Sequence, residues 1–178
     1  YGNKSQFRHV IIALTVAGDF ASGLDPERCK VIELRKQPGN DFRLPFRIAA
    51  MLRDSEADVV HARGWSTMVE AALASRMARM KGAMYAFHGK TIDELGGVCL
   101  KRRVAQGVIV RLYDRVVTLN DRMRMDLARE CCLDERKIQV VQNGIDIDLF
   151  RPRSDQQALR QRYGLPIDRF IIGNVARL

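Results

Sequence analysis

The chain has 178 residues, of which 47 % are hydrophobic, and it carries a formal net charge of +9. This length fits one domain, or one domain with the start of a second, and the apolar content excludes global disorder. No apolar run approaches the roughly 20 residues that a membrane-spanning helix needs. The charge favours anionic partners such as nucleic acid, anionic lipid or phosphorylated small molecules.

Cysteine usage indicates a reducing compartment. Cys29, Cys99 and the adjacent Cys131 and Cys132 show neither zinc-binding nor redox spacing, and a bridge between the adjacent pair would be strained. We therefore expect reduced thiols in a cytoplasmic protein.

Short apolar runs alternate with helical patterns along the chain. The run at 9–15 predicts a strand buried on both faces, and runs of the same kind lie at 30–35, 58–63, 83–88, 115–120 and 137–142. Between them, apolar residues recur at helical spacing. These stripes are Leu44, Ile48, Leu52; Val69, Leu73, Met77, Met80; Val104, Val108, Leu112; and Met123, Leu127, Cys131. The alternation predicts an α/β domain with a doubly wound parallel sheet covered on both faces.

Helix-start signals accompany two of these stripes. Thr67-x-x-Glu70 is a capping box, which places the start of the second helix at Thr67. Asn120 or Asp121 is expected to cap the fourth helix.

Ligands of such sheets bind beyond the carboxyl ends of the strands, so the residues that follow each strand are the candidate site. Arg63, Gly64 and Trp65 follow one strand, and His88, Gly89 and Lys90 close another. Gly89 lacks a Cβ and would let a ligand approach closely. We expect His88 to face a ligand, whereas His9 and His61 fit structural roles better.

The stretch 140–152, VVQNGIDIDLFRP, raises a separate question. Asn143-Gly144 is a hairpin signal, yet no second full strand follows it before Pro152. We interpret it instead as a bend that leads the chain out of the sheet, with Asp146 bonding to nearby backbone. Beyond it, Ser154-x-x-Gln157 predicts a helix start, and the run 169–178 predicts a new buried strand.

Several common sites are absent from the sequence. There is no dinucleotide fingerprint, no P-loop and no HExxH or GxSxG motif, and no carboxylate cluster has the spacing of metal ligands. A dehydrogenase or epimerase is disfavoured for this reason.

The ordered segments DVVHARGW, YAFHG, RVVTLN, KIQVVQNGIDIDLFRP and FIIGNVARL resemble successive landmarks of the retaining glycosyltransferase family 4. The resemblance implies a GT-B fold and similarity to transferases of bacterial exopolysaccharide or lipopolysaccharide assembly. Such enzymes move a sugar from a nucleotide-sugar donor to a glycan or lipid-linked acceptor. They need no further cofactor and no bound metal.

By position, the resemblance implies roles for particular residues. His88 matches the catalytic-site histidine that faces the transferred sugar, and Arg177 matches the arginine that contacts the donor diphosphate. A guanidinium can hold that leaving group bidentately. Arg63, Trp65, Gly89 and Lys90 are candidate contacts of the sugar acceptor by their place at the strand ends.

The resemblance also implies a domain organisation. Residues 1–142 would be the acceptor-side domain without its first strand, 143–153 an interdomain linker hinged at Asn143, Gly144 and Asp146, and 154–178 the start of the donor-binding domain. Ala176 stands where the family has glycine before the arginine, so the resemblance implies a tighter or shifted turn beside the donor phosphate. We expect the chain alone to transfer no sugar.

One alternative stays open: a non-catalytic basic module that binds anionic lipid or nucleic acid. Its candidate surface is Lys101, Arg102 and Arg103 with Arg111, which a solvated helix face would also explain. Little aromatic interleaving accompanies these residues, which disfavours specific nucleic-acid binding. An enzyme acting on lipid-linked acceptors would also benefit from peripheral contact with the inner face of the cell membrane.

Overall fold

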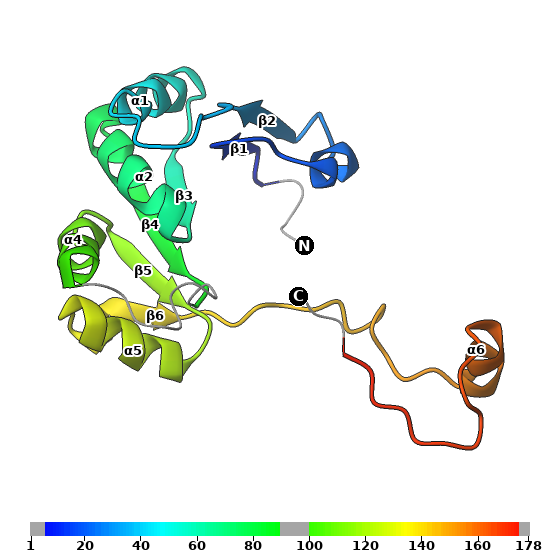
Figure 1. Ribbon diagram of the computed structural model, residues 1–178. Helices are drawn as coiled ribbons and strands as arrows, with labels where there is room; N and C mark the ends of the chain where they lie inside the picture. Colours follow the sequence, from blue (N-terminus) through cyan, green and yellow to red (C-terminus); the bar gives the residue numbers. More distant parts are fainter. Residues whose placement is uncertain (1–5, 90–99, 175–178) are drawn as a thin grey trace. The chain divides into compact units, whose positions relative to one another are not determined.

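The computed structural model describes residues 6–89 and 100–174, and the chain divides into two compact units, Tyr1–Gln142 and Asn143–Leu178. The first unit alternates strands with helices, and its paired strands run parallel (Figure 1). The predicted α/β fold is therefore confirmed.

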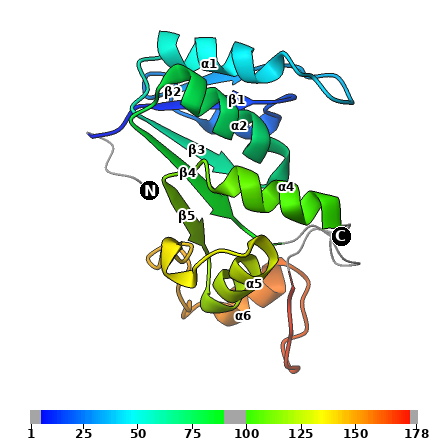
Figure 2. The same ribbon diagram turned by 90° about the vertical axis from the view of Figure 1, so that its left-hand side faces the viewer.

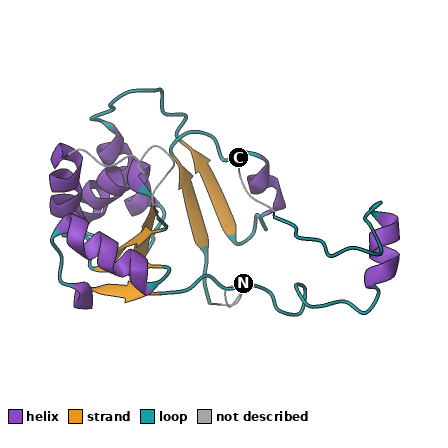
Figure 3. Ribbon diagram, turned by 60° about the horizontal axis from the view of Figure 1, so that its bottom comes forward, coloured by secondary structure: helices purple, strands orange, loops and turns teal. Residues whose placement is uncertain are grey.

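The strands of the first unit form two sheets, seen in Figure 3 as two separate sets of arrows. Strands β1 (His9–Ala13) and β2 (Cys29–Glu33) pair with each other, and the short 3-10 helix η1 (Asp19–Gly23) lies between them in the chain. The larger sheet has the order β3-β4-β5-β6. Its strands are Val59–Arg63, Gly82–Phe87, Arg115–Thr118 and Ile138–Val140.

Four helices lie on one side of the strands (Figures 1 and 2). They are α1 (Leu44–Asp54), α2 (Trp65–Ala78), α4 (Leu100–Val110) and α5 (Asp121–Cys131). Each strand of the larger sheet pairs with the next one in the chain, so right-handed crossovers put the connecting helices on the same face.

Two of the strands, β1 and β3, alternate in burial as a result. In β3, Ala62 is buried whereas Val59 and His61 are exposed, and β1 shows a similar alternation of half-buried and exposed residues. The prediction that the first strand is buried on both faces is therefore wrong for the residues that the structure describes, because the described helices cover one face.

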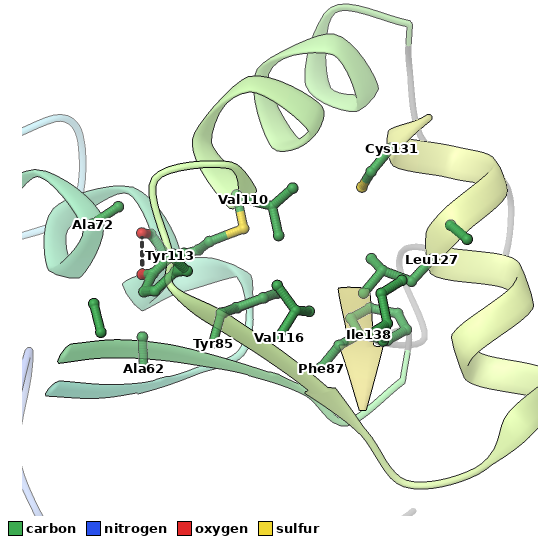
Figure 4. Packing of buried hydrophobic residues seen from close by; sticks show 13 residues of the cluster. Ala62, Ala72, Tyr85, Phe87, Val110, Tyr113, Val116, Leu127, Cys131 and Ile138 are labelled. Atoms are coloured by element: carbon green, nitrogen blue, oxygen red, sulfur yellow. Dashed lines mark hydrogen bonds between the residues drawn. The ribbon is translucent and has the colours of Figure 1, made fainter. Parts of the chain in front are cut away.

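Two apolar cores join these layers. The larger one lies between the strands and helices α2, α4 and α5 (Figure 4), and its fully buried members include Met68, Tyr85 and Leu127. A second core contains Leu44, Ile48 and Leu52 of α1 together with Ala74 of α2. Helix α2 thus contributes to both cores.

Two of the four predicted apolar stripes form the buried faces of their helices, and the other two do not. The stripes of α1 and α5 are confirmed, since Leu44, Ile48 and Leu52 are buried, as are Leu127 and Cys131. Helix α2 instead buries Met68, Ala72, Ala74 and Ser75, and helix α4 buries Gln106, Gly107 and Val110.

The physical reason is close packing between helices. Leu73 and Met77 of α2 are each 38 % exposed, because small residues occupy the positions where α2 meets its neighbours. In α4, Gly107 lies against the carbonyl of Cys131, so the small face rather than the valine stripe is turned inward.

The predicted helix starts also differ in detail. Asn120 caps α5 as expected, its side chain accepting the Met123 N–H at 2.9 Å. The capping box at Thr67 is wrong, because α2 begins at Trp65 after Gly64, and the Thr67 hydroxyl donates to the carbonyl of Arg63 at 2.8 Å.

The second unit holds helix α6 (Gln156–Arg162). Its N-cap is Asp155 rather than the predicted Ser154, and no side chain caps it. Residues 169–174 contain no strand, and Phe170 and Ile172 are 89 % and 85 % exposed, so the predicted buried strand is wrong over these residues. A strand needs a partner for its backbone groups, and the described residues of this unit provide none.

Candidate functional site

Two histidines and an arginine lie together at the carboxyl ends of β3 and β4. In the parallel register, His61 lies opposite Met84 and Arg63 opposite Ala86. Partners across a ladder share a face, and residues two apart along a strand share it too. His88, two residues beyond Ala86, therefore belongs with His61 and Arg63 at this corner.

Arg63 and His88 are in direct contact. The Nε of Arg63 donates a hydrogen bond to the Nε2 of His88 over 3.3 Å. Partial burial, followed by the Arg63 charge, lowers the pKa of His88 below its ordinary value. The pKa of His61 is lowered by burial, then by Arg63 and by His88. Both imidazoles are consequently neutral near pH 7.

Two glycines make the turns beside these side chains. Gly64 has φ 77° and Gly89 has φ 102°, in a region that residues with a Cβ rarely adopt. A Cβ on Gly89 would also lie 3.2 Å from the Cε of Met123 in α5. Gly89 therefore also lies close to α5, and its predicted approach to a ligand stays a prediction.

A second arginine joins the start of α2. The guanidinium carbon of Arg102 lies 4.4 Å from the ring centroid of Trp65, a cation–π contact between α4 and α2. Trp65 is only two residues beyond Arg63 in the chain. The sequence pattern predicted Arg102 only as part of a basic surface, and its contact with Trp65 could not be foreseen because it depends on how α4 packs against α2.

The predicted site residues therefore fall into three groups. Arg63, Trp65, His88 and Gly89 lie together at the ends of β3 and β4. Lys90 and Arg177 lie outside the described residues. Asn143, Gly144 and Asp146 belong to the second unit, between β6 and α6.

The turn at Asp146 has a specific structure. Its side chain accepts the backbone N–H groups of Asp148 at 3.0 Å and Leu149 at 2.9 Å. The expected backbone bonding of Asp146 is confirmed. Neither Asn143 nor Gly144 has a positive φ, so the stretch is not a type I′ hairpin turn.

Two arginines of the predicted basic surface, Arg102 in α4 and Arg111 just after it, contact other parts of the first unit. Arg111 donates to the carbonyls of Cys131 at 3.4 Å and Cys132 at 2.8 Å, at the end of α5, and Arg102 covers Trp65. The guanidinium of Arg111 thus contacts the carbonyl end of α5 while the residue itself remains exposed, so the role predicted for the basic surface stays a prediction.

A cavity of about 1030 Å³ lies elsewhere in the first unit. Its lining includes Asp114 and Arg115 at the start of β5, and Leu133 and Lys137 just before β6. These positions are at the opposite ends of the strands from Arg63 and His88, away from the edge where ligands of parallel sheets bind.

A parallel α/β unit with arginines and glycine turns at the carboxyl ends of its strands has the architecture of a Rossmann-like ligand-binding domain. The chain belongs to Glycosyltransferase Family 4, whose family model matches residues 3–149. The predicted GT-B type of fold agrees with this membership and with known structures.

Two solved structures resemble the chain. A glycosyltransferase from Rickettsia africae superposes with a TM-score of 0.70 at 22 % identity, over 89 % of this chain and 42 % of that one. Anabaena HepE, solved in complex with UDP and glucose, superposes with a TM-score of 0.64 at 17 % identity, over 89 % of this chain and 50 % of that one.

Curated relatives are also glycosyltransferases by name. The Escherichia coli UDP-Gal:alpha-D-GlcNAc-diphosphoundecaprenol alpha-1,3-galactosyltransferase is 24 % identical over 86 % of this chain and 39 % of its own length. The D-inositol 3-phosphate glycosyltransferase of Mycolicibacterium paratuberculosis is 35 % identical over 43 % of this chain and 17 % of its own length. The chain thus spans well under half of these relatives. Within the described part of the chain, no helix has the length and apolarity needed to cross a membrane.

Proposed function

We propose that the full-length protein is a retaining glycosyltransferase that moves a sugar from a nucleotide-sugar donor to a glycan or lipid-linked acceptor in polysaccharide biosynthesis. Family membership over residues 3–149 carries this proposal. The named relatives support it, since one uses a UDP-sugar and a diphosphoundecaprenol-linked acceptor. The donor serves as a substrate, and no further cofactor or metal is required.

In this proposal, residues 1–142 form the acceptor-side domain, 143–153 the linker with its hinge at Asn143, Gly144 and Asp146, and 154–178 the start of the donor-binding domain. The Asp146 turn gives the linker a defined bend without a helix or strand. The isolated chain is expected to be inactive, because the donor must be held by both domains.

The site residues have separate proposed roles. His88 contacts the transferred sugar, and Arg63, Trp65, Gly89 and Lys90 line the place of the sugar acceptor. Arg177 holds the donor diphosphate, where a guanidinium stabilises the charge that develops on the leaving group. The contact between Arg63 and His88 supports the grouping, because it joins a proposed acceptor residue to the proposed catalytic one.

The test is a transfer assay with the full-length protein. A panel of nucleotide sugars would be offered with a diphosphoundecaprenol-linked sugar as acceptor, and the anomeric configuration of the product would be determined by NMR. We expect transfer with retention, and a His88→Ala variant with at least tenfold lower kcat/KM. Absence of transfer from every donor, or product of inverted configuration, would contradict the proposal.

We further propose that the protein works in the cytoplasm in peripheral contact with the anionic inner face of the cell membrane. The supporting observation is a stripe on the outward face of α4. Leu100, Val104 and Val108, spaced four residues apart, are 72 %, 59 % and 59 % exposed, and Lys101 is exposed beside them. Apolar residues next to a cation on a helix surface suit an interface with anionic lipid.

A non-catalytic module that binds anionic lipid or nucleic acid is the second candidate, and the +9 charge favours it. Binding to anionic vesicles and to duplex DNA would be compared at two salt concentrations. Salt-sensitive binding to DNA with no transfer activity in the full-length protein would favour this candidate over the enzyme.

A further inference from the structure

The Arg63–His88 hydrogen bond constrains the protonation of His88. A guanidinium N–H can only donate, because arginine stays protonated and has no acceptor site. The Nε2 atom that receives this hydrogen bond must therefore carry a lone pair and no proton. A neutral imidazole with a bare Nε2 has its proton on Nδ1.

The backbone around Arg63 is held from both sides. Its carbonyl accepts the Thr67 hydroxyl at 2.8 Å, and the next N–H, that of Gly64, donates to the carbonyl of Ala86 at 3.4 Å. This second bond extends the ladder between β3 and β4 one residue past Arg63, which fixes the spacing of the two strand ends.

A small residue on β4 allows the Arg63 side chain to reach across to His88. The residue opposite Arg63 is Ala86, whose methyl group is buried and too small to separate the guanidinium from His88. A larger side chain at position 86 would stand between the two groups. Their contact is thus a consequence of the register and of the small residue on β4.

We infer that Arg63 is a positioning residue that holds His88 in the neutral tautomer with its proton on Nδ1, so that His88 meets a sugar substrate as a hydrogen-bond donor rather than as a base through Nε2. The identity of the ligand, a sugar hydroxyl or another oxygen acceptor, rests on the proposed function. The assignment of the tautomer rests only on the contact between Arg63 and His88. Within the described residues, Nδ1 has no hydrogen-bond partner that would compete for its proton.

The charges around the site agree with this assignment. Among the residues that the structure describes, Arg63 is the cation in contact with His88, and His61 lies on the same side of β3 as Arg63. The pKa of each histidine is depressed by burial and by Arg63, so both stay neutral as the assignment requires. Protonation of His88 would break the Arg63 bond and place two cations in contact.

The test is a long-range proton–nitrogen NMR correlation spectrum of the histidine rings, which shows which ring nitrogen carries the proton. It would be recorded on the 178-residue chain at pH 7.5, with His61→Gln and His88→Gln variants assigning the signals. We expect the proton on Nδ1 of His88 in the wild type. In Arg63→Met we expect a shift toward the Nε2-protonated form and a rise in the His88 pKa.

Arg47→Met is the matched control, because it removes an exposed arginine of α1 and should leave the His88 spectrum unchanged. A wild-type His88 protonated on Nε2 would overturn the inference without any variant, even if Arg63→Met failed to fold. An unchanged tautomer in a folded Arg63→Met chain would also overturn it.

Activity of the full-length protein separates this inference from the proposed function. With the Nδ1 tautomer present and transfer observed, Arg63→Met should lower kcat/KM about tenfold, the equivalent of one hydrogen bond. If the tautomer is present but no sugar is transferred, the enzymatic proposal fails and the assignment of Arg63 stands. If sugar is transferred and His88 is protonated on Nε2, the proposed enzymatic function stands and the tautomer inference is overturned.

Discussion

The hydroxyl of Tyr113 donates a hydrogen bond of 2.6 Å to the backbone carbonyl of Met68, and both residues are buried (Figure 4). The bond ties the loop after α4 to the first turns of α2. The Tyr113 ring also lies 5.5 Å from that of Tyr85 in β4, so one side chain joins a strand and two helices. Burial of the phenol raises the pKa of Tyr113 and keeps it a donor throughout the physiological range.

Replacing Tyr113 by phenylalanine should therefore destabilise the first unit. The change removes one of the hydrogen bonds to the buried carbonyl of Met68, which, inside a helix, also accepts from the α2 backbone. We expect a cost of about 0.5–1.5 kcal/mol in the free energy of unfolding. Urea denaturation followed by circular dichroism measures this loss. Tyr163→Phe, at a site 65 % exposed, is the control and should change stability by only a few tenths of a kcal/mol.

Asp114 is expected to make stability depend on pH in acid. Its carboxylate accepts the Ala83 N–H at 2.8 Å and a bond from Arg76 at 3.1 Å. These contacts, the Ala83 bond first, lower the pKa of Asp114 below the ordinary 3.8 against an opposing effect of burial. Its stabilisation is therefore complete above the unfolded-state pKa and is lost as pH falls through the folded-state value.

An Asp114→Asn variant should be less stable than the wild type by about 1 kcal/mol at pH 7, since it weakens two hydrogen bonds. The difference should shrink as pH falls from 5 to 3, which denaturant titrations at several pH values would measure. Asp54→Asn, at the exposed end of α1, controls for the loss of a carboxylate. A difference that is constant across this pH range would contradict the assignment.

Gly107 should not tolerate alanine, although it lies inside a helix. A Cβ there would approach the backbone oxygen of Cys131 to 3.0 Å, and Arg111 holds the carbonyls of Cys131 and Cys132 in place. The clash outweighs the gain of about 1 kcal/mol in helix propensity, so we expect a net loss of about 1–2 kcal/mol.

Thermal or urea unfolding of Gly107→Ala measures that loss. Gly23→Ala is the matched control, since its Cβ would meet no atom within 4 Å and its φ is not positive. Equal free energies of unfolding for the two variants would contradict the prediction, since α4 and α5 would then accommodate the added methyl group without loss of stability.

A charge on the apolar stripe of α4 should weaken membrane binding. Val104→Glu removes an exposed apolar side chain and adds a negative charge near anionic lipid, for an expected loss of at least tenfold in affinity. Co-sedimentation with vesicles of phosphatidylglycerol and phosphatidylcholine measures it. Val16→Glu carries the same change at a site 63 % exposed in a loop and should have a smaller effect. Equal binding by both variants would exclude the α4 stripe as the contact.

The sequence alone determined the order of the elements and the places where the backbone needs special residues. The strands and helices of the first unit occur in the predicted order along the chain, and the Asn120 cap and the Asp146 turn follow from local hydrogen bonding. Such features depend on residues a few positions apart. They can therefore be predicted from the local sequence without knowledge of the tertiary contacts.

The tertiary structure decided which faces are buried and which side chains meet. The small face of α2 and the Gly107 face of α4 turn inward because neighbouring helices approach closely there, which apolar periodicity does not encode. Arg63 and His88 are 25 residues apart in the chain, and only the register of β3 against β4, with Ala86 between them, brings them into contact. The protonation of His88 thus depends on strand pairing, a property of the folded sheet rather than of either segment.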